Sequence, residues 1–244
     1  MDRALWITWY DLPAAGRDAH LAWLHGSYIP RLLSRPGFLW AAHYATDPQF
    51  YKGAMQGRMR HTDDAAVPTG NEYILLVGAK DAHAFAHPIP AKLHAELPPD
   101  ELKMLSTRDN ERVNIFTEEA RTDGPEANLR EGRMVLAPCI QIGSFNIGSH
   151  RDEDEMLDWY ANWRMPSMHK MPGCVGARKL VSVAGWAKHG VLYEFLSLEA
   201  RNLHFPNHEK SNPEMNAWSE RLVPKLVHAP GSLNPACRLW PPAQ

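Results

Sequence analysis

The sequence predicts an α+β protein in which two consecutive βαββαβ repeats bring two antiparallel sheets face to face. Three observations support this fold class. A spaced motif occurs twice in the chain, and a similar order of strand-type and helix-type segments surrounds each copy. The length of 244 residues also suffices for two units of ordinary size that bury a core without disulfides or metal.

The repeated motif is a tryptophan followed at fixed spacing by two prolines and a glycine. Four matched positions with one offset of 136 are hard to obtain by chance: Trp23, Pro30, Pro36 and Gly37 recur as Trp159, Pro166, Pro172 and Gly173. Farther along the chain, Asp81, Ala82 and Pro88 match Glu199, Ala200 and Pro206 at an offset of 118. The smaller offset indicates an 18-residue insertion in the first repeat.

The insertion belongs to residues 46–71, which are polar, contain Gly53, Gly57, Pro68 and Gly70, and show no periodicity. We expect a long loop there and consider it a candidate lid. The turn-rich stretch 122–128, Thr-Asp-Gly-Pro-Glu-Ala-Asn, separates the repeats. The predicted units are therefore residues 1–121, which carry the insertion, and residues 132–244.

Each repeat begins with a strand-type run, at residues 4–10 and 135–145. A helix follows, after Asp11-Leu12-Pro13 in the first repeat and from Ser149 in the second, where Ser149 and Asp152 form a capping-box-like start. Pro30 and Pro166 should interrupt these helices near their ends. A second helix should start at Asp81 or Glu199. Further strands are expected at residues 38–44, 73–77 and 113–118, and at residues 174–181, 191–197 and 236–240.

This order is the ferredoxin-like one, in which helices cover one face of the sheet and the other apolar face must pair with a second sheet. The stretches Ala22-Trp23 to Pro36-Gly37-Phe38, and Asp158-Trp159-Tyr160 to Pro172-Gly173, resemble the helix-to-strand signature of the dimeric α/β-barrel superfamily. That superfamily includes EthD-like proteins and antibiotic-biosynthesis-type monooxygenases. Many of its members carry histidine two residues before the first proline, where this sequence has Tyr28 and Arg164.

Composition excludes several classes of protein. The formal net charge is −2 and there is no basic stripe, so we expect no nucleic-acid partner. No stretch of eighteen apolar residues and no cleavable leader pattern occurs, which predicts a cytoplasmic protein without a membrane segment. Three widely spaced cysteines, Cys139, Cys174 and Cys237, should be free thiols.

Polar side chains on buried strands are the first candidates for a site, because alternate residues should point into the space between the sheets. We expect Thr8, Tyr10, His43, Gln141, Arg178 and Glu194 there, with Trp6 and Trp40 among the aromatic residues that bind the ligand. Arg178 and Glu194 could form a structural ion pair. Alternatively, Arg178 anchors a carboxylate or enolate and Glu194 is a general base with a raised pKa.

Further candidates lie on or beside the repeated motif. Tyr28 and Arg164 occupy equivalent positions one turn before the proline, where the resemblance implies pocket residues; the alternative is a core tyrosine and a solvated arginine. His25, His43 and His169 could reach the pocket and titrate near neutral pH, although most single histidines are structural. The predicted catalytic set is Arg178, Glu194, Tyr28, His43 and His25, and the predicted substrate-binding set is Trp6, Thr8, Tyr10, Trp40, Gln141, Arg164 and His169.

His83 and His87 could ligate zinc, but no H-E-x-x-H motif accompanies them, so we predict no metal site. Phosphate-loop, dinucleotide and G-x-S-x-G motifs are also absent from a suitable context. The leading hypothesis is an enzyme acting on a hydrophobic aromatic or carbonyl-bearing small molecule, as a lyase, isomerase, cyclase or cofactor-independent oxygenase. The resemblance supplies that choice, and no cofactor is predicted. The alternatives are a haem-binding barrel protein and a non-catalytic ligand-binding or stress-response module. A homodimer is also considered.

Overall fold

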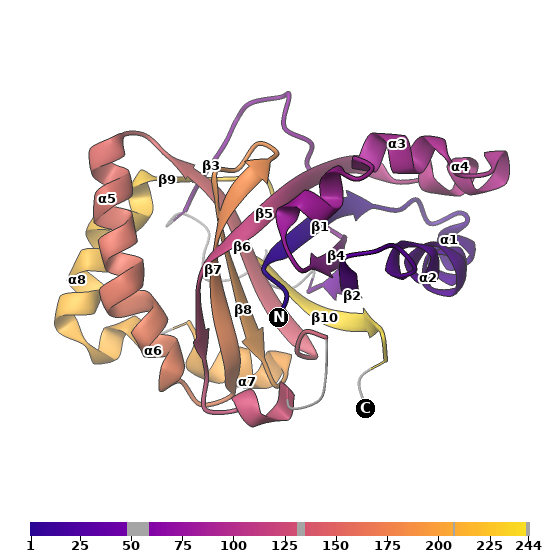
Figure 1. Cartoon of the computed structure of the whole chain (residues 1–244). Helices are drawn as coiled ribbons and strands as arrows, with labels where there is room; N and C mark the ends of the chain where they lie inside the picture. The colour runs from indigo at the N-terminus through magenta and orange to yellow at the C-terminus, as the bar shows by residue number, and fades with distance from the viewer. Residues whose placement is uncertain (48–58, 131–134, 207, 243–244) are drawn as a thin grey trace.

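A closed antiparallel barrel of eight strands forms the centre of the molecule (Figure 1). The computed structural model describes residues 1–47, 59–130, 135–206 and 208–242. The ring runs in the order β10-β2-β4-β1-β5-β7-β8-β6, and pairing of β6 with β10 closes it. Its strands are β1 (Ala4–Asp11), β2 (Phe38–Thr46), β4 (Tyr73–Ala79), β5 (Asp109–Asp123), β6 (Cys139–Ile147), β7 (Cys174–Ala184), β8 (His189–Phe195) and β10 (Asn234–Trp240).

The first half of the chain, from β1 to β5, and the second half, from β6 to β10, each supply four neighbouring barrel strands. Their orders, β2-β4-β1-β5 and β7-β8-β6-β10, are both ferredoxin-like. The halves meet where β5 pairs with β7 and where β10 pairs with β2. The predicted fold class is therefore confirmed, whereas the domain limits 1–121 and 132–244 stay predictions.

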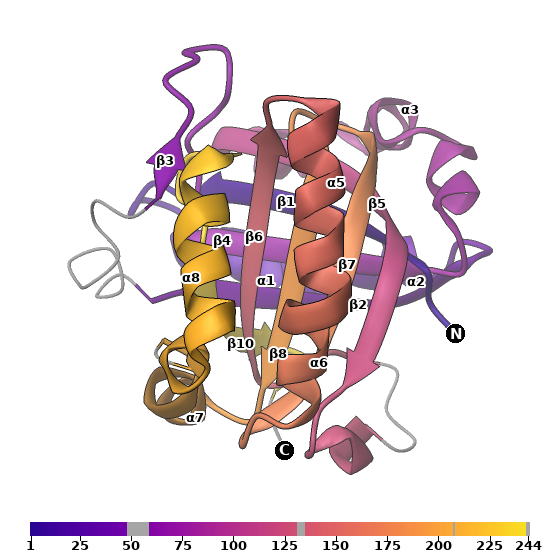
Figure 2. The same ribbon diagram turned by 90° about the vertical axis from the view of Figure 1, so that its left-hand side faces the viewer.

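Helices cover the outside of the barrel in two groups, one from each half, on opposite sides (Figures 1 and 2). The first-half group comprises α1 (Arg17–Trp23), α2 (Ile29–Leu33), α3 (Pro90–Ala95) and α4 (Pro99–Leu105). The second-half group comprises α5 (His150–Trp159), α6 (Met165–His169), α7 (Leu198–His204) and α8 (Pro213–Leu222). Among the described residues, no helix combines the length and apolarity needed to cross a bilayer.

The helices do not stop at the two repeated prolines, which differs from the prediction. A π-helical turn precedes each proline: η1 (Leu24–Tyr28) in the first half and η5 (Tyr160–Arg164) in the second. In η1 the N–H of Ile29 donates to the carbonyl of Leu24, and η5 has the equivalent bond. The helix then resumes with proline in its first turn, where a backbone donor is not needed. The last residues of the two turns, Tyr28 and Arg164, are both buried.

The predicted helix start at Ser149 is confirmed, since its side chain accepts a hydrogen bond from the Asp152 N–H and caps α5. The predicted loop at residues 46–71 is only partly described. Residues 48–58 lie outside the described residues. Beyond them, β3 (Arg60–His61) pairs in parallel with β9 (Leu226–His228), and Val67 is buried. The second part of the insertion is therefore attached to the second half of the fold.

The interior of the barrel is filled with apolar side chains. They come from strands of both halves and include Leu5, Ile7, Trp9, Trp40, Tyr44, Ile74, Leu76, Phe116, Ile140, Ile142, Leu180 and Leu192. The sequence predicts ligand-binding residues in this space. The close packing instead makes it the central core of the protein.

The predicted direction of several strand side chains was wrong. Trp6 and Tyr10 do not face the barrel interior but pack between the first-half sheet and its helices, and Thr8 has the same parity on β1. His43 is hydrogen-bonded to Tyr10 on that side of the sheet. In the second half, Gln141 accepts a hydrogen bond from Arg201 of α7. Both faces of these strands are buried, so alternation along the sequence could not show which face points inward.

We expect Leu192→Ala to lower the free energy of unfolding by about 2–5 kcal/mol, because it opens a cavity in the filled barrel interior. The matched control is Leu203→Ala, at a side chain that is 74% exposed, which should change stability by about 0.5 kcal/mol or less. Urea denaturation followed by circular dichroism measures both values. Equal destabilisation by the two substitutions would contradict a packed interior.

Candidate active site

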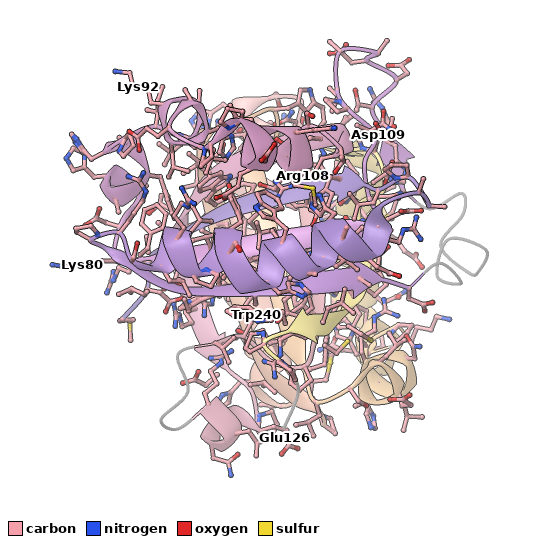
Figure 3. The ribbon with its side chains drawn as sticks, turned by 90° about the vertical axis from the view of Figure 1, so that its right-hand side faces the viewer. Lys80, Lys92, Arg108, Asp109, Glu126 and Trp240 are labelled. Atoms are coloured by element: carbon pink, nitrogen blue, oxygen red, sulfur yellow. The ribbon has the colours of Figure 1, made fainter. Side chains whose placement is uncertain are left out.

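Buried polar side chains gather between the first-half sheet and its helices. We call this set the first-half polar cluster. Figure 3 looks onto this side of the molecule and labels Arg108 and Trp240 on opposite borders of the α1–α2 helical segment. The cluster consists of Tyr10 on β1, His20 on α1, His25 and Tyr28 on η1, His43 on β2, His94 on α3 and Arg108 just before β5.

Three members of this cluster form a hydrogen-bonded chain. The Tyr10 hydroxyl lies 2.8 Å from Nε2 of His43, and Nδ1 of His43 lies 2.9 Å from Nε2 of His25. Tyr10 and His43 are fully buried, whereas His25 is partly exposed at the outer end. Burial holds the pKa of His43 well below its usual value, and nearby His25 and Arg108 lower it further. The chain is therefore neutral at physiological pH and links a buried phenol to the surface.

Arg108 lies against the aromatic rings of this cluster. Its guanidinium carbon is 4.5 Å from the ring centre of Tyr10 and 5.5 Å from that of Tyr28. Nη1 donates to the Glu111 carboxylate at 3.0 Å, but Nε and Nη2 are buried without a hydrogen-bond partner among the described residues. The aromatic faces compensate the charge only in part. The missing partner of such a guanidinium is typically an anionic oxygen.

The other members of the cluster are also perturbed by burial. The Tyr28 hydroxyl lies 2.7 Å from Nε2 of His94, and burial raises the pKa of Tyr28 to about 12. Burial raises the pKa of Tyr10 as well. His20 contacts the Thr107 hydroxyl through Nδ1 at 2.8 Å, and burial together with Arg108 lowers the pKa of His20 to about 4. Both phenols are therefore protonated and His20 is neutral at pH 7.

The structure thus brings together four of the predicted site residues, namely Tyr10, His25, Tyr28 and His43. Trp6 borders them, with its ring centre 5.8 Å from that of His94. Sequence reasoning missed His20, His94 and Arg108. His20 lies four residues before the buried Leu24, so helical spacing could have placed it on the inward face of α1. Arg108 follows Ser106-Thr107 in an irregular segment whose pattern gave no signal.

Arg178, Glu194 and Trp40 lie elsewhere, at one end of the barrel interior. The buried Glu194 carboxylate accepts hydrogen bonds from Arg130 Nη2 at 2.5 Å and from the Ala137 N–H at 2.9 Å. Arg178 donates to Asp2 at 2.5 Å, and its Nε lies 3.8 Å from Glu194. The indole of Trp40 also donates to Asp2. The structural ion pair considered from the sequence is therefore present as one part of a network in which both acidic groups already have partners.

The second half has its own buried arginine. Arg164 donates to the Tyr193 hydroxyl at 2.8 Å, to Nε2 of His208 at 2.8 Å and to the Glu209 carboxylate at 2.5 Å. Burial next to Arg164 lowers the pKa of His208 to about 3. A cavity of about 460 Å³ adjoins this network; its lining includes Trp163, Lys170, Met171, His204, His208 and Met215. Of the remaining candidates, His169 is exposed and contacts the Asp123 carbonyl through Nδ1.

No protein-family model and no curated protein matches the sequence. Solved structures similar to the chain include an anthrone oxidase-like protein, with a TM-score of 0.61, 9% identity, and coverage of 98% of this chain and 92% of that one. A Fusobacterium nucleatum protein that is named as a monooxygenase is also similar, with a TM-score of 0.58 and 8% identity. The match covers 98% of this chain and 93% of that one. A Lactobacillus acidophilus protein with the same kind of name has a TM-score of 0.53 and 10% identity. The match covers 98% of this chain and 94% of that one.

At such low identity these similarities define the fold alone. The chain has the dimeric α/β-barrel fold, and the predicted resemblance to that superfamily is confirmed at this level. Several of these solved structures bear the names of enzymes, in agreement with the expectation of an enzyme.

The prediction that the protein has no cofactor is contradicted. A dye-decolorizing peroxidase from Bacteroides thetaiotaomicron is similar to the chain, with a TM-score of 0.53 and 10% identity. A chlorite dismutase-type structure is also similar, with a TM-score of 0.50 and 11% identity. Peroxidases hold haem iron through a histidine. The lack of a nucleotide motif in the sequence therefore does not exclude a cofactor in this fold.

Three histidines of the two polar networks, His208, His43 and His20, do not fit a haem site. Iron requires an imidazole nitrogen with a free lone pair and an open face beside it. His208 engages the Phe205 carbonyl through Nδ1 and Arg164 through Nε2, and both nitrogens of His43 are engaged in the chain described above. His20 retains Nε2, but the ring centres of Tyr10 and Trp23 lie 5.9 and 5.3 Å from its own. We therefore derive no step through haem.

Removing Glu194 from its network should destabilise the fold. We expect Glu194→Ala to lower the free energy of unfolding by about 3–5 kcal/mol, because it leaves Arg130 and the Ala137 N–H without their buried partner. The control is Glu96→Ala, which breaks the ion pair between Arg35 and Glu96, a side chain that is 60% exposed. This substitution should lower the free energy of unfolding by about 1 kcal/mol or less. Urea denaturation compares the two; an equal loss would show that the Glu194 network contributes no more than a surface pair.

His20 should make stability depend on pH. Its pKa is about 4 in the folded protein and about 6.5 when unfolded, so the unfolded chain binds more protons between these values. The free energy of unfolding should fall as the pH is lowered from about 6.5 to about 4. In His20→Asn the slope should decrease by up to about 1.4 kcal/mol per pH unit. His150→Asn, at a side chain that is 87% exposed, should keep the wild-type slope. Denaturation at a series of pH values measures these slopes, and an unchanged slope in His20→Asn would contradict the assignment.

Proposed function

We propose that the protein is an enzyme that transfers a proton from an aromatic or carbonyl-bearing small molecule and holds the resulting anion at Arg108. The observation that carries this proposal is the pair of unsatisfied buried donors on Arg108, next to the phenol that ends the Tyr10–His43–His25 chain. A buried cation stabilises negative charge that develops beside it, and it does so more strongly than in water.

The hydrogen-bonded chain has two neutral arrangements that agree with its distances. In the first, Tyr10 donates to Nε2 of His43, and Nδ1 of His43 donates to Nε2 of His25. In the second, both donations are reversed, so that the Tyr10 hydroxyl proton is no longer donated to His43. Proton positions in such chains follow from the network rather than from the coordinates. Neither arrangement requires a charged histidine, which fits the lowered pKa values of His43 and His25.

Conversion of the first arrangement to the second moves one proton outward. The substrate gives its proton to the Tyr10 oxygen, the original Tyr10 proton passes to His43, and the His43 Nδ1 proton passes to His25. The proton on Nδ1 of His25 leaves to solvent. The substrate retains the electron pair as an enolate or phenolate beside Arg108. The reverse sequence would return a proton to the substrate, so the same residues serve as base and acid.

The substrate class follows from the surroundings of this chain. Trp6, Trp23 and Tyr28 provide aromatic surface next to the polar groups, which suits a flat molecule with one oxygen directed at Arg108. The anthrone oxidase-like and monooxygenase-type names of similar structures support an aromatic ketone and a subsequent oxygenation, at the level of the fold. Because the barrel closes within one chain, a second copy is not needed to complete this site.

The experiment is deuterium uptake from D₂O into the methylene group of anthrone, an aromatic ketone, under nitrogen and measured by mass spectrometry. Wild-type protein should accelerate uptake over buffer. Tyr10→Phe removes the first proton carrier and Arg108→Gln removes the cation, so each should reduce the catalysed rate by about 100-fold or more.

The matched control is Tyr193→Phe, which removes a buried, hydrogen-bonded phenol in the second half and should leave the rate unchanged. Circular dichroism establishes that each variant is folded. Uptake by wild-type protein at the rate of buffer, or an unchanged rate in folded Tyr10→Phe, would reject the proposal.

A further inference from the structure

The barrel closes at a short seam between β6 and β10. Residue pairing runs from Asn234 opposite Ile142 to Cys237 opposite Cys139, so a pair of cysteines ends the seam. Pro235 within it has no N–H to donate. The two cysteines are 98 positions apart in the chain, and only barrel closure places them side by side.

The local geometry matches that of a disulfide. The N–H of Arg238 donates to the Pro138 carbonyl at 2.8 Å, so the adjacent pair Cys139–Cys237 is a non-hydrogen-bonded pair of the antiparallel ladder. Cα atoms in such pairs are about 4.5 Å apart, and disulfides span about 4.4–6.8 Å.

Both cysteine side chains point to the outer face of the barrel. Their neighbours Ile140 and Ala236 face the interior, whereas Cys139 packs in the layer between the second-half sheet and its helices. The two thiols lie close enough for each to shift the pKa of the other. No movement of the backbone is therefore needed to join them.

The two thiols differ in a way that suits stepwise oxidation. Cys237 is exposed and Cys139 is buried. The neighbouring Cys139 thiol lowers the pKa of Cys237, which favours the thiolate, the reactive form. The third cysteine, Cys174, is buried, and burial raises its pKa to about 12.

We propose that Cys139 and Cys237 form a reversible disulfide across the barrel seam when the protein meets a peroxide. The Cys237 thiolate attacks hydrogen peroxide; an S–O bond forms, the O–O bond breaks and hydroxide leaves. The Cys139 sulfur then attacks the sulfenic sulfur of Cys237; the S–S bond forms, the S–O bond breaks and water leaves with the thiol proton. The peroxide gains two electrons and the two thiols lose two. A thiol such as glutathione reverses the step by exchange.

The experiment treats the full-length reduced protein with a small excess of hydrogen peroxide and maps its peptides by mass spectrometry without reduction. We expect a linked peptide pair containing Cys139 and Cys237, an intact mass lower by two hydrogens, and recovery of both thiols with glutathione. Cys174→Ala is the matched control and should give the same linked pair.

Two variants separate the roles of the cysteines. Cys139→Ser should stop the reaction at a sulfenic acid on Cys237, which dimedone traps, and Cys237→Ser should leave Cys139 reduced. Oxidation of Cys237 in the wild type to sulfinic acid without a linked pair would overturn the proposal. So would a disulfide that joins Cys237 of two separate chains. Because wild-type peptide mapping decides the result, the test does not depend on how well Cys139→Ser folds, and it is independent of the proposed enzyme activity.

Discussion

Closure of the barrel within one chain is the constraint on which the rest of the structure depends. Pairing of β5 with β7, β10 with β2 and β6 with β10 leaves no free edge in the ring of eight strands. The ring is narrow enough for side chains of both sheets to fill its interior. The first-half polar cluster and the Arg164 network instead lie in the two layers between sheet and helices, where polar side chains of different elements meet.

The two halves use these layers differently. The π-helical turn before each repeated proline directs an equivalent residue inward, Tyr28 in the first half and Arg164 in the second. Arg164 donates hydrogen bonds to Tyr193, His208 and Glu209, and none of its nitrogens is a buried donor without a partner among the described residues, so its charge has a structural role. In the first half the cation is supplied instead by Arg108, which retains two unsatisfied donors. This asymmetry is the physical basis for placing the proposed chemistry in the first half.

Barrel closure also brings together groups that are far apart in the sequence. Arg178 meets Asp2 at one end of the interior, and Cys139 meets Cys237 at the seam. β10 carries Cys237 and, three residues later, Trp240, whose ring centre lies 6.2 Å from that of His25. One strand, β10, therefore carries both Cys237 of the seam and Trp240, which lies beside the outer end of the Tyr10–His43–His25 chain.

The sequence by itself determined the order of elements, the offset between the halves, the cap at Ser149 and the importance of the segment before each proline, because these depend on local spacing and on backbone chemistry. It also singled out Tyr10, His25, Tyr28 and His43. Only the tertiary structure decided that these residues share one layer with Arg108, and that Arg178 and Glu194 lie apart in an ion-pair network. Strands buried on both faces carry no signal for which parity points inward, and Arg108 acquires its role from rings that are distant in the sequence.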